Sequence, residues 1–281
     1  MFVPYLCAAV FFAASVQADE PKRTALKVCA DPNYAPFSTR DGTGFENRLA
    51  ALLAADLGLP LEYAWFPQRM GFIRNTLRAK SEDGEQFKCD LVMGVPHEFE
   101  LAITTEPYMH STYALVLPKG GRLDGIDSGK ALVALSDERK ANLRIGMSER
   151  SPGTVWLAKY GLYDQIKAYV AQSGDPAEYP GEPILKDLLA GKLDAAVVWG
   201  PTAAHFAKVA QQADRAFRVV ALESEPGVQF DFRISAAVRH ADTAWRDEVD
   251  GLLQRNAPKI KDLFTEYGIP LVDDAGKLVA R

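Results

Sequence analysis

Ten side chains combine the aromatic and polar chemistry of small-molecule pockets, and they fall on loops or at element ends of the expected fold. Aromatic rings form apolar walls, while a carboxylate, a guanidinium or a hydroxyl group fixes the orientation of a bound molecule. We therefore predict a ligand cleft lined by Asp31, Tyr34, Phe37, Glu46, Trp65, Arg69, Tyr108, Ser151, Thr154 and Trp199.

Several of these side chains also have a purely structural explanation. Trp65, at the end of a strand, and Phe37 could simply fill space between two lobes. Glu46 would be a favourable acid in the first turn of its helix. Arg69 could contact a partner protein or order its own loop, and the sequence leaves both readings open.

The common catalytic and metal-binding motifs are missing from the sequence. It contains no Walker loop, no G-x-G-x-x-G, no G-x-S-x-G and no H-E-x-x-H. Glu98 and Glu100 resemble an acid pair, but acids two residues apart on a turn are more often solvated surface. No metal-ligand spacing joins the four histidines, which are His97, His110, His205 and His240. We predict no catalytic residue, no metal site and no enzyme; a hydrolase built from distant residues is the weakest alternative.

Residues 26–48 are the unit that positions the first part of the cleft. Residues 26–30 form a short apolar run typical of a buried strand, which the turn residues 31–33 end. Apolar residues at positions 45, 49, 52, 53 and 57 share one helix face, and Gly58 and Pro60 end that helix. A strand, a polar and aromatic loop and a helix together build one wall of a cleft in an open α/β sheet. A second helix is predicted over residues 69–79, with Met70, Ile73 and Leu77 on one face.

A weak internal repeat predicts two lobes. Residues 88–96 and residues 192–201 both read as Lys-x-Asp, a buried strand and a proline turn, and each follows an amphipathic helix. Chance similarity of two buried strands is the alternative. We expect an α/β fold in which lobe one is discontinuous, with residues 24–117 and 228–281, and lobe two is residues 118–227.

The N-terminus and the cysteines predict export. Residues 1–18 are apolar and end in Val16-Gln17-Ala18, which has the small residues of a signal-peptidase site. The run is shorter than the ~20 residues of a membrane span, so we expect a cleaved signal and no stable span afterwards; an uncleaved anchor is the alternative. Cys29 and Cys89 then remain, on strands expected to be neighbours. A disulfide is slightly favoured over two buried thiols.

The bulk composition limits the partners. The chain has 281 residues, 48% hydrophobic and 25% charged, with a net charge of −5. This composition is typical of a soluble globular protein. The sequence has no cluster of basic residues of the kind that binds nucleic acid, so nucleic acid is not an expected partner.

Nine short stretches, in this order and spacing, resemble one protein family. They are residues 28–33, 44–48, 67–69, 71–77, 89–96, 104–108, 111–113, 197–201 and 266–270. Together they resemble the J accessory proteins of methanol dehydrogenase systems, which have the type II periplasmic solute-binding fold. His110 stands where this family leads us to expect an arginine, and the loop at 80–87 is longer than usual.

The resemblance implies an exported, periplasmic and non-enzymatic protein. It would assist the maturation or activity of a methanol or alcohol dehydrogenase that depends on pyrroloquinoline quinone (PQQ). The partners would be that enzyme and its cytochrome c. It would carry no PQQ or haem of its own, in keeping with the absence of C-x-x-C-H. The alternative is the substrate-binding component of an ABC importer for a small, unknown solute.

The resemblance also makes amino-acid binding testable. Amino-acid binders of this fold hold the ligand carboxylate with an arginine after the third strand of lobe one, because its planar fork suits a carboxylate. They hold the ammonium group with an aspartate at the end of the matching strand in lobe two. Here the first position reads His97-Glu98-Phe99-Glu100 and the second reads Trp199-Gly200-Pro201. We therefore expect that free amino acids do not bind.

Overall fold

The structure is a computed structural model that describes residues 23–171 and 179–279. The predicted signal at residues 1–18 lies outside the described residues. None of the helices in the described part of the chain is long and apolar enough to cross a membrane.

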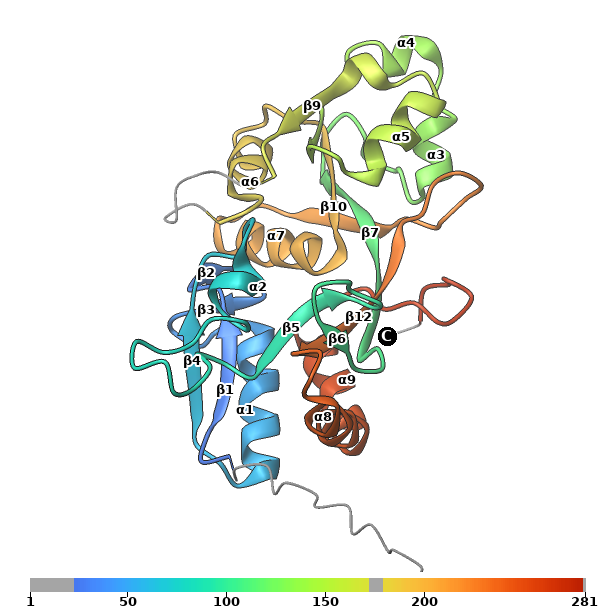
Figure 1. The fold of residues 1–281 in the computed structure, drawn as a ribbon. Coiled ribbons are helices and arrows are strands. Elements are labelled where there is room, and N and C mark those ends of the chain that lie inside the picture. The colour runs from blue at the N-terminus through green and yellow to red at the C-terminus, as the bar shows by residue number, and fades with distance from the viewer. Residues whose placement is uncertain (1–22, 172–178, 280–281) are drawn as a thin grey trace, which may run out of the picture.

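Lobe one is built on a mixed sheet (Figure 1). β1 (Leu26–Ala30) runs parallel to β4 (Leu61–Trp65) and to β5 (Leu91–Pro96), and β12 (Asp231–Val238) lies antiparallel to β5. The short β6 (Ile103–Thr104) pairs with β12. Three helices cover one face and bury the main core of this lobe: α1 (Phe45–Leu57), α8 (Thr243–Arg255) and α9 (Ala257–Glu266).

Lobe two has its own sheet, in the order β11 (Phe217–Ala221), β7 (Met109–Pro118), β10 (Ala195–Trp199), β8 (Ile145–Ser148) and β9 (Ile166–Tyr169). Side chains of β7 alternate between its two faces. Leu115 and Leu117 pack with α3 (Gly129–Val133) and α5 (Pro152–Lys159). Ala114 and Val116 pack with α6 (Glu182–Leu189) and α7 (Gly200–Gln212).

The long strand β7 joins the lobes. Its first half pairs with β12 of lobe one, and its second half pairs with β10 and β11 of lobe two. Met109 belongs to the buried cluster of lobe one and Leu115 to that of lobe two. On this basis we propose the two-lobe division expected from the sequence, with the start of lobe two moved from residue 118 into β7, near residue 113.

Helix periodicity predicted α1 correctly, and it failed for residues 69–79. α1 ends at Gly58, which takes the left-handed conformation that favours glycine at this position. In the second segment only α2 (Phe72–Asn75) is helical. Gly71 has φ +88°, which interrupts a helix, so Met70 lies outside it and is 96% exposed. Ile73 and Leu77 are buried, but they share no helix face with Met70.

The disulfide is present. Cys29, in β1, and Cys89, just before β5, are bonded, with their Cα atoms 5.4 Å apart. The prediction of a disulfide is therefore confirmed, because the parallel pairing of β1 with β5 brings the two residues together. Arg239 supports this site by donating to the Cys89 carbonyl at 2.7 Å and by pairing with Asp90.

Candidate functional site

A cleft with a volume of about 260 Å³ lies between the lobes. Tyr34 comes from β2 (Asn33–Tyr34), a short strand after β1 that pairs with β3 (Ser38–Thr39), and Tyr113 comes from β7. The loop between β8 and α5 contributes Ser151, and the end of β10 contributes Trp199. Of the ten predicted cleft residues, the structure brings Tyr34, Ser151 and Trp199 together here.

Tyr113 and Trp199 line this cleft, and Phe232 packs against both of them, so that the three side chains form its aromatic base. The ring centroids of Tyr113 and Trp199 are 5.4 Å apart, and Phe232 lies 6.2 Å from Tyr113 and 6.0 Å from Trp199. Trp199 is held in place because Gly200, the next residue, packs closely on β7: a Cβ atom on Gly200 would lie 2.5 Å from the carbonyl oxygen of Thr112. The result is a rigid aromatic surface where β10 ends.

The loop that precedes α5 gives the cleft its polar edge. Ser151 caps α5, and its hydroxyl accepts from the Gly153 amide at 3.2 Å. Arg150 lines the cleft, is exposed and has φ +61°, an uncommon conformation for a residue other than glycine. Thr154 is different: its hydroxyl lies 3.5 Å from the Met147 sulfur, on the interior side of lobe two.

Asp31 organises the loops of lobe one. Its two carboxylate oxygens accept from the backbone amides of Asn33, at 2.8 Å, and Gln68, at 2.6 Å. Tyr34 stacks on Phe37 with ring centroids 4.6 Å apart, and Phe37 is buried against Phe45 in the core. Asp31 and Phe37 therefore shape the wall that carries Tyr34.

Glu46 is a buried acid behind this wall. Among the described residues its carboxyl group forms no ion pair and no hydrogen bond. Burial raises the pKa of Glu46 to about 8. The pKa values of Tyr34 and Tyr108 are also raised, first by burial and second by the charge of Glu46, which places the three side chains together. The Tyr108 hydroxyl accepts from the Gly94 amide at 2.9 Å.

Gly94→Ala is expected to destabilise the protein more than Gly42→Ala. Both glycines have positive φ, +71° and +79°, but a Cβ atom on Gly94 would lie 2.3 Å from Glu46 Oε1, whereas one on Gly42 would meet nothing within 4 Å. We expect losses of about 2–3 and about 1 kcal/mol in the free energy of unfolding, measured by urea denaturation. Equal losses would show that Glu46 does not occupy this space.

Trp65 and Arg69 lie outside the inter-lobe cleft. Trp65 stacks on Tyr63 with ring centroids 4.4 Å apart, beneath the Arg40 guanidinium, and lines a separate cavity of about 370 Å³ beside β4. Arg69 is half-buried before α2, where its carbonyl accepts from the Phe72 amide. The structure thus does not bring these two residues into the inter-lobe cleft.

The sequence prediction missed Tyr113 and Phe232. Residues 111–117 read as an ordinary buried strand, and nothing in that pattern shows that it crosses between the lobes. Tyr113, the one Phe, Tyr or Trp residue of that strand, and the alternating Phe230 and Phe232 were the available signal.

Neither clamp position carries the charge that an amino acid needs. His97 follows β5, and its Nδ1 lies 3.0 Å from the Ser235 hydroxyl. Glu98 and Glu100 come next on the same turn. The matching position in lobe two is Trp199. Within the described residues, no group of three or more His, Cys, Asp or Glu side chains could hold a metal ion.

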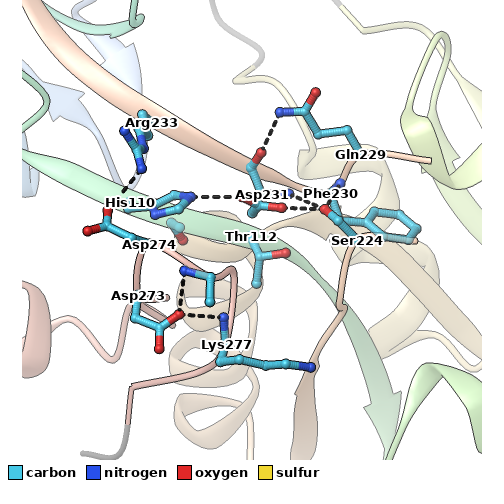
Figure 2. A network of polar contacts seen from close by, with 12 residues as sticks. His110, Thr112, Ser224, Gln229, Phe230, Asp231, Arg233, Asp273, Asp274 and Lys277 are labelled. Atoms are coloured by element: carbon cyan, nitrogen blue, oxygen red, sulfur yellow. Dashed lines mark hydrogen bonds and ion pairs between the residues drawn. The ribbon is translucent and has the colours of Figure 1, made fainter. Parts of the chain in front are cut away.

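A polar network joins the lobes at β7 and β12 (Figure 2). His110 Nε2 lies 2.8 Å from Asp231 Oδ2, and Ser224 donates to the other oxygen of Asp231. The hydroxyl of Ser224 therefore contacts the carboxylate and not the imidazole, unlike the nucleophile of a catalytic triad. Arg233 pairs with Asp274, which ties the C-terminal segment to the same place. The network links β7, β12 and the C-terminal segment.

Comparison with known proteins gives consistent similarities. No family model matches the chain. The crystal structure of the periplasmic binding protein XoxJ from Methylobacterium extorquens AM1 shares 30% identity, covers 89% of this chain and 100% of its own, and has a TM-score of 0.69. The structure of MxaJ from Methlophaga aminisulfidivorans MPT shares 27% identity over 88% of this chain and 100% of its own, with a TM-score of 0.71. MoxJ from Methylorubrum extorquens is 25% identical over 272 residues, 92% of this chain and 85% of that protein.

Proposed function

The chain belongs to the family of XoxJ, MxaJ and MoxJ, with the type II periplasmic-binding-protein fold, and on this premise we propose that it assists a PQQ-dependent methanol or alcohol dehydrogenase. In this role it is exported to the periplasm, has no catalytic activity of its own, and associates with the dehydrogenase to promote its maturation or activity.

The observation that carries this function is the aromatic base of the inter-lobe cleft. Trp199 occupies the end of β10, where an amino-acid binder of this fold needs a carboxylate, and packs on Tyr113 and Phe232. An indole ring has no negative charge to balance an ammonium group. Burial of an ammonium group without a charged partner is costly. The cleft therefore supports a role other than amino-acid uptake.

Standard amino acids are expected to give no binding heat in isothermal titration calorimetry. With both clamp charges missing, we expect dissociation constants weaker than about 1 mM, which corresponds to a binding free energy of less than about 4 kcal/mol. Micromolar binding of any one of the standard amino acids would contradict the assignment of the cleft.

A second candidate is the binding component of an importer for another small solute. The cleft of about 260 Å³ with its aromatic wall, Ser151 and Arg150 favours it, because small-ligand pockets combine such groups. A thermal-shift screen distinguishes it: a solute at 100 times its dissociation constant stabilises the folded protein by about 2.7 kcal/mol. A clear hit, together with no association with the dehydrogenase, would favour import.

Association with the dehydrogenase is tested by size-exclusion chromatography. The mature protein is mixed at tens of micromolar with the PQQ dehydrogenase of the same organism, both as apoenzyme and as assembled enzyme. We expect co-elution with at least one form. The protein alone and the enzyme alone are the controls, and separate elution from both forms would contradict association.

A further inference from the structure

β11 is an edge strand with one side unpaired. Within the described part of the chain it pairs only with β7. The amide of Leu222 donates to the Tyr113 carbonyl, and Lys119 donates to Ala216, so the even-numbered residues of β11 face β7. The amides and carbonyls of Phe217, Val219 and Ala221 point the other way, and no described group bonds to them.

A groove lies on each side of this edge. One, of about 820 Å³, is lined by Arg218, Val220 and Leu222, with Trp156 and Phe230 among its apolar walls. The other, of about 650 Å³, is lined by Phe217, with Ala204 and Tyr267 across from it. Val219 and Ala221 line both grooves, as does Leu278 of the C-terminal segment, so the two grooves meet beside the outward backbone of β11. A strand added here would place successive side chains in opposite grooves.

The edge lacks the features that usually prevent strand addition. Exposed edges are commonly protected by a proline, a bulge or a charged side chain over the edge. β11 has the sequence FRVVA, and its one charged residue is turned aside. The Arg218 guanidinium donates to the Ile126 carbonyl at 3.0 Å and pairs with Asp124 at 3.3 Å.

The charge around the groove of about 650 Å³ favours an acidic side chain on a bound strand. Lys208 and Lys261 both line it, and neither forms an ion pair with another described residue. Glu266 also lines this groove, but it already pairs with Arg48. Lys208 also lies over the Tyr267 ring, with its Nζ 5.5 Å from the ring centroid. A carboxylate at the matching position of a bound strand would complement the charge of the two lysines.

From this arrangement we propose that β11 binds an extended strand of a partner protein. The strand adds to the edge through the backbone groups of Phe217, Val219 and Ala221. It places apolar side chains in both grooves and an acidic side chain near Lys208 and Lys261. Backbone bonds then provide affinity and the alternating grooves provide specificity. That this partner is the dehydrogenase rests on the proposed function.

Val219→Pro tests the edge without disturbing the sheet. Proline removes an outward amide and places its ring over the edge, while the bonds between β11 and β7 use other residues. Val219→Thr is the matched control, because it keeps the amide and the branched side chain. Thermal melting establishes that both variants fold like the wild type.

Binding is measured with three probes: the apo-dehydrogenase, overlapping peptides from its sequence, and a synthetic peptide of alternating valine and threonine that ends in aspartate. We expect Val219→Pro to weaken binding by about tenfold or more and Val219→Thr by no more than about twofold. Amide hydrogen exchange is the second readout. The amides of Phe217, Val219 and Ala221 should exchange fast in the free protein and slow down on binding, while those of Arg218 and Val220 stay protected.

The possible outcomes distinguish the proposal that β11 binds a strand from the proposed accessory function. If Val219→Pro binds the dehydrogenase as the wild type does, the edge proposal is overturned and the accessory function stands. If the synthetic peptide binds the wild type and not Val219→Pro, while the dehydrogenase binds neither, the edge stands and the accessory function fails. No binding of any probe overturns both. Self-association that Val219→Pro abolishes would make a second copy the occupant and overturn a partner strand.

Discussion

Replacing Glu46 by glutamine is expected to stabilise the protein at high pH, by about 4 kcal/mol more at pH 9 than at pH 5. The pKa of Glu46 is raised to about 8 by burial, from 4.5 in the absence of the fold. The folded state therefore keeps a proton that the unfolded state releases between these values. The stability of the wild type falls as the pH rises through this window, and glutamine removes this loss because it does not ionise.

Urea denaturation at pH 5, 7 and 9 measures the effect. The wild type should lose stability relative to Glu46→Gln at each step. Glu248→Gln is the matched control, since Glu248 also lies on a helix of lobe one but is exposed; its profile should follow that of the wild type. Parallel profiles for the wild type and Glu46→Gln would show that the carboxyl group is solvated or paired in solution.

Replacing Cys29 and Cys89 together by alanine is expected to lower the free energy of unfolding by about 4 kcal/mol. The bond links residues 60 positions apart, and loop-closure entropy for such a loop is worth about 4 kcal/mol. The loop contains α1 and β4, and thus the wall that carries Tyr34 and Glu46.

Urea denaturation of the double variant and of the wild type with a reductant measures this contribution. The two should agree, because each lacks the bond. A loss below about 1 kcal/mol would mean that the unfolded chain is already constrained between these positions.

Much of the fold was predictable because its elements have clear periodicity. The apolar spacing over residues 45–57 gave the bounds of α1, and the run at 111–117 lies within β7. Residues 69–79 failed because Gly71 takes a left-handed conformation that apolar spacing cannot reveal. The crossing of β7 between lobes depends on tertiary pairing, which leaves no mark on its pattern.

The cleft was less predictable because loop side chains are oriented by distant contacts. Asp31 was a reasonable ligand, yet its carboxylate accepts from the backbone of Asn33 and of Gln68, which lies 37 residues further along the chain. Thr154 was expected on a loop, but it lies in α5 and its hydroxyl contacts the Met147 sulfur. Trp199 could be placed because it is the last residue of a buried strand, and the position of a strand end does not depend on how the loops fold.

The most direct test of the accessory function is the active fraction of dehydrogenase reconstituted from apoenzyme and PQQ. Turnover is recorded with and without the mature protein at tens of micromolar, with Glu248→Gln as a variant that should behave as the wild type. We predict that the protein associates with the enzyme and raises its active fraction. Unchanged turnover, with no association with either the apoenzyme or the assembled enzyme, would contradict this function and favour a solute importer.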